Sequence, residues 1–153
     1  MKSNEHSKRK YITIVSIAIV VVLIDQITKF LIKTNFELNQ TLPLIKNFFH
    51  FTYITNFGAG FGILQQQEFI LIFISIIVIG VIVYHFDRIK EKEILLQALV
   101  GFVLGGTIGN LIDRIAYGFV IDFLDFRIWP IFNVADSFVT IGVIGLIIYF
   151  WNK

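Results

Sequence analysis

Four apolar segments alternate with more polar connections along the chain. They cover about residues 11–32, 69–86, 94–112 and 134–151. Each segment approaches the roughly 20 residues that an α-helix needs to cross about 30 Å of hydrocarbon. The pattern therefore predicts an all-α integral membrane protein, with four transmembrane helices in a single membrane domain over residues 1–153.

The first apolar segment begins like a signal peptide. Four basic residues precede the apolar run 11–24, namely Lys2, Lys8, Arg9 and Lys10, but no small-residue cleavage pattern follows it. Instead, the apolar pattern resumes after Asp25 and continues to residue 32. We therefore expect the first helix to remain uncleaved.

The distribution of basic residues predicts the orientation. Cations gather in the N-terminal segment and in the short connection that contains Arg88, Lys90 and Lys92. Cytoplasmic loops of membrane proteins carry an excess of Lys and Arg. We therefore expect both termini in the cytoplasm. The predicted cytoplasmic segments are 1–10, 87–93 and 152–153, and the predicted outer segments are 33–68 and 113–133.

The first outer connection has the character of a β-strand. Its sequence F-F-H-F-T-Y-I-T, at residues 48–55, is rich in β-branched and aromatic residues that partly alternate with polar ones. Such a pattern is typical of strands. It predicts a small β-rich platform on the outer surface of the helical bundle.

Composition narrows the class of protein further. Hydrophobic residues make up 56% of the chain, and the mean hydropathy is +0.79, both well above the values of a soluble domain. The net charge of +2 comes from scattered Lys and Arg without a basic face, so a nucleic-acid partner is not expected. Because the chain has no cysteine, disulfides, thiolate metal sites and cysteine nucleophiles are excluded.

The third apolar segment carries a strip of glycines. Gly101, Gly105 and Gly109 recur every four residues, and Gly106 lies beside them. This spacing places small residues on one helix face, where another helix can approach closely. We interpret the strip first as a helix-packing surface.

Most polar side chains that interrupt the apolar pattern map to the outer end of the predicted bundle. An ionisable group within hydrocarbon costs roughly 2.5–3.5 kcal/mol on insertion scales, so a convergent set indicates a candidate functional site. The set comprises Asp25, Lys29, Asn56, Asn110, Asp113, Arg114, Asp122, Asp125, Asn133 and Asp136.

Two pairs in this set also have structural interpretations. Asp25 and Lys29 are spaced i, i+4, which favours an ion pair along a helix, and Lys29 can alternatively extend to the membrane surface. Asp113 and Arg114 can form an interfacial pair at the end of the third helix. Neither pair therefore requires a catalytic role to explain its presence.

A third structural interpretation concerns the start of the fourth helix. Asn133 is a favourable N-cap residue, and Asp136 follows three residues later, where its carboxylate can complete a capping box. An acid near a helix N-terminus is also stabilised by the helix dipole. Capping alone would explain an aspartate at the edge of an apolar segment.

The surroundings of Asp122 in the sequence suggest a catalytic role for this acid together with Asp136. It lies in F-V-I-D-F at residues 119–123, where large apolar neighbours disfavour the ionised carboxylate. Asp136 at a helix start is favoured in its ionised form. Two carboxyls with different proton affinities can divide general acid and general base catalysis between them.

Other catalytic arrangements have less support in the sequence. His6, His50 and His85 are scattered, so a metal site is not expected. A serine triad is also not supported, because His50 alone would have to serve as the base for Ser137.

Five blocks in order along the chain resemble those of the lipoprotein signal peptidases, or signal peptidase II. They are D-Q-I-T-K at 25–29, N-F-G-A-G-F at 56–61, G-G-T-I-G-N-L-I-D-R at 105–114, V-I-D-F at 120–123 and F-N-V-A-D-S at 132–137. The resemblance covers nearly the whole chain from residue 25 onward, including the four-helix layout.

The resemblance implies an aspartyl endopeptidase of the bacterial cytoplasmic membrane, with its active site at the outer face. The implied substrate is a diacylglyceryl prolipoprotein, cut on the amino side of its lipidated cysteine. The family's catalytic pair corresponds to Asp122 and Asp136. No cofactor is implied, and we expect a monomer in contact with membrane lipid. The supporting residues carried over are Asp25, Lys29, Asn56, Gly106, Asn110, Asp113, Arg114 and Asn133.

Two functions from other classes are alternatives. A small transport or proton-relay protein would use its acids to line a path across the membrane, and would distribute them through the bilayer. A non-catalytic scaffold would recruit partner helices through the glycine strip. The position of the acids at one end of the predicted bundle favours the peptidase.

Overall fold

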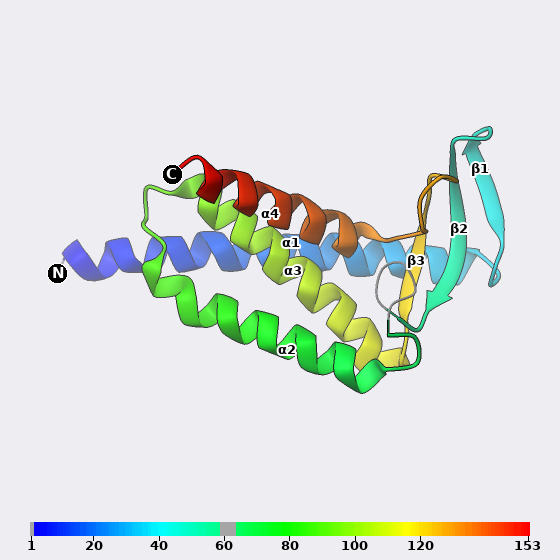
Figure 1. Ribbon diagram of the computed structural model, residues 1–153, viewed down its shortest axis with the longest axis horizontal. Coiled ribbons are helices and arrows are strands. Elements are labelled where there is room, and N and C mark those ends of the chain that lie inside the picture. The colour runs from blue at the N-terminus through cyan, green and yellow to red at the C-terminus, as the bar shows by residue number, and fades with distance from the viewer. Residues whose placement is uncertain (1, 59–63) are drawn as a thin grey trace.

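The computed structural model has a bundle of long helices with a small sheet across one end (Figure 1). The structure describes residues 2–58 and 64–153, and side chains from Lys8 onward. Within these residues, four helices are long and apolar enough to cross a membrane, which confirms the predicted fold class. They are α1 (Lys2–Asn35), α2 (Glu68–His85), α3 (Ile94–Tyr117) and α4 (Val134–Trp151), and a 3-10 turn, η2 (Phe86–Arg88), follows α2.

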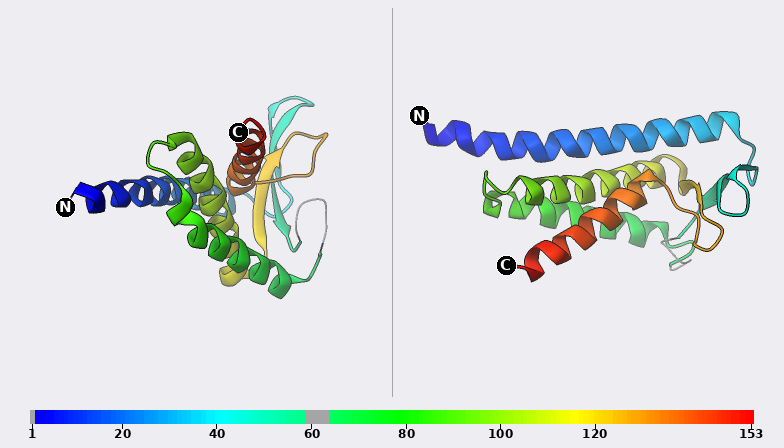
Figure 2. Two further views of the ribbon diagram at one scale, coloured as in Figure 1. Left: turned by 60° about the vertical axis from the view of Figure 1, so that its left-hand side comes forward. Right: turned by 90° about the horizontal axis from the view of Figure 1, so that it is seen from above.

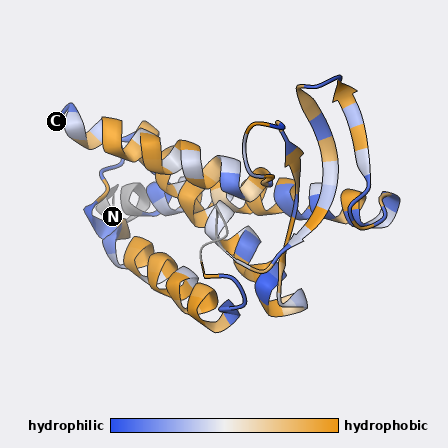
Figure 3. Cartoon of the chain, turned by 45° about the vertical axis from the view of Figure 1, so that its right-hand side comes forward, coloured by the Kyte–Doolittle hydropathy of each residue, from blue (hydrophilic) through white to orange (hydrophobic). Residues whose placement is uncertain are grey.

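Helix α3 is the centre of the bundle. It contacts α1, α2, α4 and the sheet. In its most apolar stretch 61% of the residues are buried, compared with 28% for α1, 17% for α2 and 11% for α4. The helices around α3 therefore expose many large apolar side chains, as expected where the surrounding medium is lipid. Figure 3 shows that α2 and α4 consist mainly of hydrophobic residues.

The helix boundaries extend beyond the predicted segments at α1, which covers residues 2–35 instead of 11–32, and at α3. Helix α4 covers the predicted residues 134–151, whereas α3 continues past residue 112 to Tyr117. It ends at Gly118, which has a φ of 77° and donates its N–H to the Arg114 carbonyl at 3.0 Å. Glycine adopts this left-handed conformation without steric cost and commonly ends helices. Asp113 and Arg114 therefore lie within the last turns of α3.

The sheet contains three antiparallel strands in the order β1-β2-β3 within the described residues. They are β1 (Thr41–Ile45), β2 (Phe49–Asn56) and β3 (Val120–Asp125). The first two form the β-rich platform that the sequence predicts. Strand β3 comes from the second predicted outer connection and joins the sheet by pairing with β2. Figure 1 shows the sheet at one end of the bundle, and both chain termini at the opposite end.

The glycine strip is a packing surface, as expected. A Cβ atom on Gly105 would lie 2.7 Å from the Ala18 carbonyl oxygen on α1, and one on Gly101 would lie 2.8 Å from the Ile17 side chain. On the neighbouring face of α3, Gly106 packs against Ala135 of α4. Figure 2 shows α1 and α4 on different sides of α3. The glycines thus allow both helices to approach α3 closely.

This packing leads to a stability prediction. We expect Gly105→Ala to lower the melting temperature in detergent, because the added methyl group forces α1 and α3 apart, and overpacking of this kind costs about 1–3 kcal/mol. Gly80→Ala on α2 is the matched control, since nothing lies within 4 Å of its Cβ position. Equal melting temperatures for the two variants would contradict the assignment.

Candidate active site

A cavity of about 520 Å³ lies where the sheet meets the helical bundle, and the side chains of Asp122 and Asp136 both line it. The cavity also contacts Asn56, Asn110 and Arg114. Its remaining walls are largely apolar and include Val120, Phe132, Val139 and Ile141. A mostly apolar cavity with a few convergent polar groups is typical of a ligand or active site.

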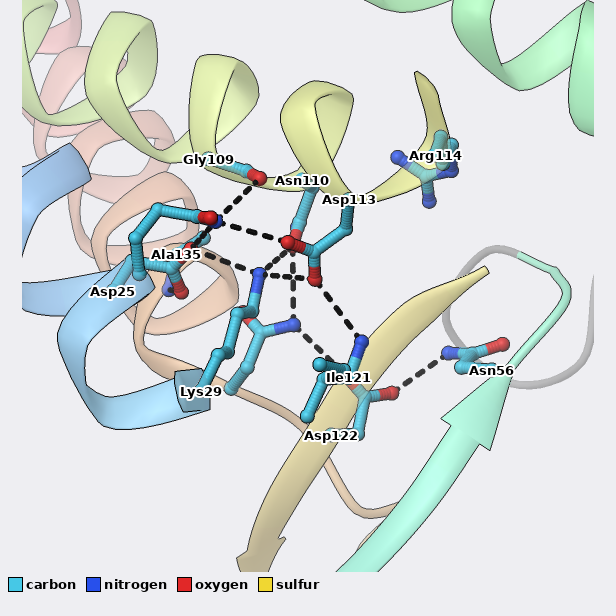
Figure 4. Close-up of polar contacts among 12 residues, drawn as sticks. Asp25, Lys29, Asn56, Gly109, Asn110, Asp113, Arg114, Ile121, Asp122 and Ala135 are labelled. Carbon is cyan, nitrogen blue, oxygen red and sulfur yellow. Dashed lines mark hydrogen bonds and ion pairs between the residues drawn. The ribbon is translucent and has the colours of Figure 1, made fainter. Parts of the chain in front are cut away.

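Asp122 comes from β3 and is fully buried. Pairing of β3 with β2 places Asp122 opposite Ile54, and Asn56 lies two residues further along β2. The Asn56 amide donates a hydrogen bond of 2.8 Å to one Asp122 oxygen, and the Asn133 amide donates one of 2.7 Å to the other. Both carboxylate oxygens therefore have an amide donor, and Figure 4 shows the contact with Asn56.

The surroundings of Asp122 strongly favour its protonated form. Burial raises the pKa of its carboxyl, and the negative charge of Asp136 raises it further. The hydrogen bonds from Asn56 and Asn133 act in the opposite direction, because they stabilise the ionised form. The resulting pKa of Asp122 is about 7, well above the ordinary value of an aspartate.

Asp136 lies in the first turn of α4, where it completes the predicted capping box. The Asp136 backbone N–H donates to the Asn133 side chain at 2.8 Å, and the Asn133 N–H donates to an Asp136 oxygen at 3.4 Å. The other Asp136 oxygen accepts a hydrogen bond of 2.7 Å from the Asn110 amide. The cap therefore sets the position of Asp136 and leaves its carboxylate on the cavity wall.

Asn133 connects the two acids. Its side-chain NH₂ donates to Asp122 and, at 3.1 Å, to the oxygen of Asn110, whose own NH₂ donates to Asp136. A continuous chain of amides thus joins one carboxylate to the other. Because Asn133 is fully buried, breaking this chain would leave polar groups without partners.

Lys29 is the centre of a buried charge network beneath the cavity. Its ammonium lies 2.8 Å from Asp25, 2.9 Å from Asp113 and 3.0 Å from the Asn110 oxygen, as Figure 4 shows. Its side chain is only 2% exposed. The predicted Asp25–Lys29 ion pair is therefore present, whereas the alternative in which Lys29 extends to the membrane surface is wrong.

The two acids of this network also hold the backbone next to the cavity acids. Asp25 accepts a hydrogen bond of 2.9 Å from the N–H of Ala135, the residue before Asp136. Asp113 accepts one of 3.1 Å from the N–H of Ile121, the residue before Asp122. Lys29 bonds to both acids and so connects the positions of α4 and β3.

Two further expectations concern Arg114 and Gly106. Arg114 does not pair with Asp113: it donates to the Gly58 carbonyl at 3.3 Å and lines the cavity, so the predicted interfacial pair is wrong. Asp113 instead points inward to Lys29 because α3 continues beyond residue 112. Gly106 makes room for Ala135 and so acts through helix packing.

Some site residues are absent from the predicted set. The Gln26 amide donates to Asp113 at 2.9 Å, to Asp25 at 3.2 Å and to the Gly109 carbonyl at 3.2 Å. The sequence feature that could have identified Gln26 as a site residue is its position within the block D-Q-I-T-K. Gly58 donates its N–H to the Asn56 oxygen at 2.9 Å. Residues 59–61 of the N-F-G-A-G-F block lie outside the described residues.

Of the three His residues, the structure describes the side chains of His50 and His85, whereas that of His6 lies outside the described part. His50 is buried on β2, and His85 ends α2 at the opposite end of the bundle. In the described part of the chain, no group of three or more His, Cys, Asp and Glu side chains is arranged to hold a metal ion.

The fold and the site define a multi-pass membrane protein whose buried polar network presents two carboxyls to one cavity. Over residues 17–152 the chain matches the family described as Signal peptidase (SPase) II. The lipoprotein signal peptidase of Halothermothrix orenii is 41% identical over 137 residues, which cover 90% of this chain and 94% of that protein. The lipoprotein signal peptidase of Brevibacillus brevis is 46% identical over 129 residues, covering 83% and 87%.

Solved structures agree with the sequence comparisons. One, described as a bacterial membrane enzyme determined by the in meso method at 2.3 Å resolution, matches with a TM-score of 0.87 and 37% identity over 92% of this chain and 88% of that chain. A second, at 1.9 Å, has a TM-score of 0.82 and 37% identity over 90% and 92%. The chain therefore belongs to the signal peptidase II family, a family of membrane peptidases.

The raised pKa of Asp122 predicts a pH-dependent stability. Between about pH 4 and pH 7 the folded protein retains a proton on Asp122 that the unfolded chain has lost. The contribution of Asp122 to the free energy of unfolding therefore falls as the pH rises through this interval. We expect the melting temperature of Asp122→Asn in detergent to fall less over this interval than that of the wild type.

Asp125→Asn is a control, because the contribution of Asp125 to stability should change with pH in the opposite direction to that of Asp122. Burial raises the pKa of Asp125, but hydrogen bonds from Thr52 and Arg127 outweigh burial and lower it. Stability from Asp125 is present above the pKa of the unfolded chain and is lost at acid pH. If Asp122→Asn and the wild type lost stability in parallel between pH 4 and 7, the assignment to Asp122 would be wrong.

Proposed function

We propose that this protein is an intramembrane aspartyl endopeptidase that removes signal peptides from diacylglyceryl prolipoproteins. Cleavage takes place on the amino side of the lipidated cysteine. Membership of the signal peptidase II family supports the substrate class, and the relatives from H. orenii and B. brevis are named lipoprotein signal peptidases. The observation that carries the aspartyl mechanism is that Asp122 and Asp136 line one cavity and are joined through Asn133 and Asn110.

The proposed reaction requires one proton on the pair of carboxyls. The ionised aspartate removes a proton from a water molecule as the water oxygen bonds to the scissile carbonyl carbon. The protonated aspartate donates to the carbonyl oxygen. The tetrahedral intermediate then breaks its C–N bond. The aspartate that took the proton from water donates it to the departing cysteine nitrogen, while a hydroxyl of the intermediate returns a proton to the other aspartate. The products are the carboxylate of the signal peptide and the free amine of the lipidated cysteine.

The electrostatics of the cavity support such a shared proton. The pKa of Asp122 is about 7 because burial and the charge of Asp136 both oppose its ionisation. Two carboxyls that interact in this way release their protons in two steps that belong to the pair. General acid and base catalysis by two aspartates requires a single proton on such a pair.

The surrounding polar residues suit positioning roles in this mechanism. Asn56, Asn110 and Asn133 donate to the two carboxylates and so set their orientation. Arg114 lies on the cavity wall with one nitrogen bonded to the Gly58 carbonyl, and its guanidinium has further donors for a substrate main-chain carbonyl. Lys29 acts through Asn110 rather than on the substrate.

The shape of the cavity suits a substrate anchored in lipid. Val139 and Ile141 extend the cavity wall along α4 from Asp136 toward the middle of the helix. At a rise of about 1.5 Å per residue, this wall continues for roughly 7 Å into the membrane-spanning part of α4. Ile141 is 54% exposed, so the wall opens to the side, where acyl chains of the substrate can lie in surrounding lipid.

We further propose that both termini are cytoplasmic and that the cavity faces the outer side of the bacterial cytoplasmic membrane. Arg88, Lys90 and Lys92 lie at the end of the bundle that carries the termini, and the positive-inside rule assigns this end to the cytoplasm.

A monomer suffices for the reaction, since all groups that the mechanism uses come from one chain. The arrangement of the acids disfavours transport. Asp25 and Asp113 bond to Lys29, which connects through Asn110 and Asn133 to Asp136 and Asp122. These four acids therefore belong to one network and do not form a path across the bundle.

Substitution of either cavity acid tests the proposal. We expect Asp122→Asn and Asp136→Asn each to reduce cleavage of a purified diacylglyceryl prolipoprotein in detergent by at least about 100-fold, because each removes a group that transfers a proton. Intact mass of the released lipidated product measures both the rate and the position of the cut.

Asp125→Asn provides the matched control. Asp125 is a buried acid on the same strand as Asp122, and it lies outside the set of residues that line the cavity. This variant should retain most of the wild-type rate. Undiminished cleavage by a folded Asp122→Asn or Asp136→Asn variant would refute the proposed pair, whereas a cut at another bond would refute only the substrate assignment.

The hydrogen bond from Asn56 predicts a shift in the pH–rate profile. The profile should be bell-shaped, and its basic limb should report loss of the last proton from the pair. Because the Asn56 amide stabilises the ionised form of Asp122, we expect Asn56→Ala to move this limb to higher pH by about one unit. A lower rate with an unchanged limb would indicate that Asn56 does not act through Asp122.

A further inference from the structure

A second cavity lies at the opposite end of the bundle from the carboxylate pair. Its volume is about 630 Å³, within the usual range of roughly 300–1,000 Å³ for ligand pockets. The end of α2, the first half of α3 and the end of α4 form its walls. Figure 1 shows α2 and α4 on opposite sides of α3, so the cavity is a groove with α3 as its floor.

The walls of this groove are apolar and open sideways. Val81 on α2, Val100 on α3, and Leu146 and Phe150 on α4 all line it. Val81 is 53% exposed and Phe150 is 60% exposed, so the groove is accessible from the side of the bundle. In a membrane this side is in contact with hydrocarbon, and an acyl chain is the group that fills such a groove most favourably.

The rim of the groove is basic. Arg88, Lys90 and Lys153 line its outer end, together with a single acid, Glu93. Glu93 accepts hydrogen bonds from the Lys153 ammonium at 2.6 Å, the Lys90 backbone N–H at 2.9 Å and the Tyr149 hydroxyl at 3.1 Å. The Lys153 ammonium and the Lys90 N–H lower the pKa of Glu93 to about 2, so its charge compensates that of Lys153.

Arg88 and Lys90 retain uncompensated charge. In the part of the chain that the structure describes, no salt bridge joins either residue to an acid. Asp87, next to Arg88, accepts a hydrogen bond from the Tyr11 hydroxyl of α1 and so is engaged away from the groove. Arg88 also lies over the Tyr84 ring at 6.0 Å, which restricts the position of its guanidinium.

We propose that this groove binds one anionic phospholipid. The phosphate lies between Arg88 and Lys90, and an acyl chain follows the apolar walls toward the middle of the bundle. Basic pockets between transmembrane helices favour anionic head groups over zwitterionic ones, because no partner charge on the lipid neutralises the phosphate. The site is separate from the proposed peptidase cavity, and the proposal does not depend on the peptidase activity.

The proposal is tested by lipid binding to purified, delipidated protein. Native mass spectrometry with phosphatidylglycerol should detect one tightly bound lipid, and phosphatidylcholine with the same acyl chains should bind at least about tenfold more weakly. Phosphatidylglycerol should also raise the melting temperature, since a ligand that binds the folded state stabilises it. Equal affinities for the two lipids would overturn the proposal.

Charge-matched double variants locate the site. Arg88→Gln with Lys90→Gln should weaken phosphatidylglycerol binding by about tenfold or more. Lys8→Gln with Arg9→Gln removes the same charge from exposed positions of α1 at the same end, and should leave binding nearly unchanged. Unchanged binding by the first variant, or an equal loss by both, would overturn the proposed site.

A competition experiment with inorganic phosphate distinguishes a lipid site from a site for a soluble anion. Inorganic phosphate in excess should neither displace phosphatidylglycerol nor raise the melting temperature, because it cannot occupy the apolar walls. Displacement of the lipid by inorganic phosphate would show a soluble-anion site and would also overturn the proposal. Melting curves without added lipid check that both double variants are folded.

Discussion

The ammonium of Lys29 is the interaction on which the organisation of the site depends. It lies 2.8 Å from Asp25 and 2.9 Å from Asp113, in a place almost inaccessible to solvent. Burying an ion costs several kcal/mol unless it is well paired, and removing one partner of a buried pair typically costs 3–5 kcal/mol. The same two carboxylates accept the N–H groups of Ala135 and Ile121. One charge therefore holds α1, α3, α4 and β3 in a single arrangement.

This arrangement places two acids from different kinds of structure on one cavity. Asp122 comes from a buried strand, where burial and a neighbouring negative charge oppose its ionisation. Asp136 comes from a helix start, where its carboxylate accepts the N–H of Asn133 and the amide of Asn110. Asn133 donates to one acid and caps the helix that carries the other. The polar network thus keeps two chemically similar side chains in different environments.

Local patterns predicted the helices and the cap, whereas contacts between distant segments were not predictable. Helix α4 matches its predicted bounds because its cap, Asn133 with Asp136, is local in sequence. Strand β3 was not recognised, because nearly all of its residues are buried and no alternation marks it. Lys29 was given a surface alternative because its partner Asn110 lies 81 residues away. The five blocks indicated which residues gather, but the hydrogen bonds among them required the folded chain.

The capping box at the start of α4 has a consequence for biogenesis. Asn133 and Asp136 take up their positions only when the last helix has formed and has packed beside α3, since Asn110 of α3 completes the network. A nascent chain that has inserted only its first three helices contains Asp122 without its partner. In the proposed mechanism, the pair of carboxyls is therefore complete only when the last helix has entered the membrane to the depth at which Asp136 meets Asn110.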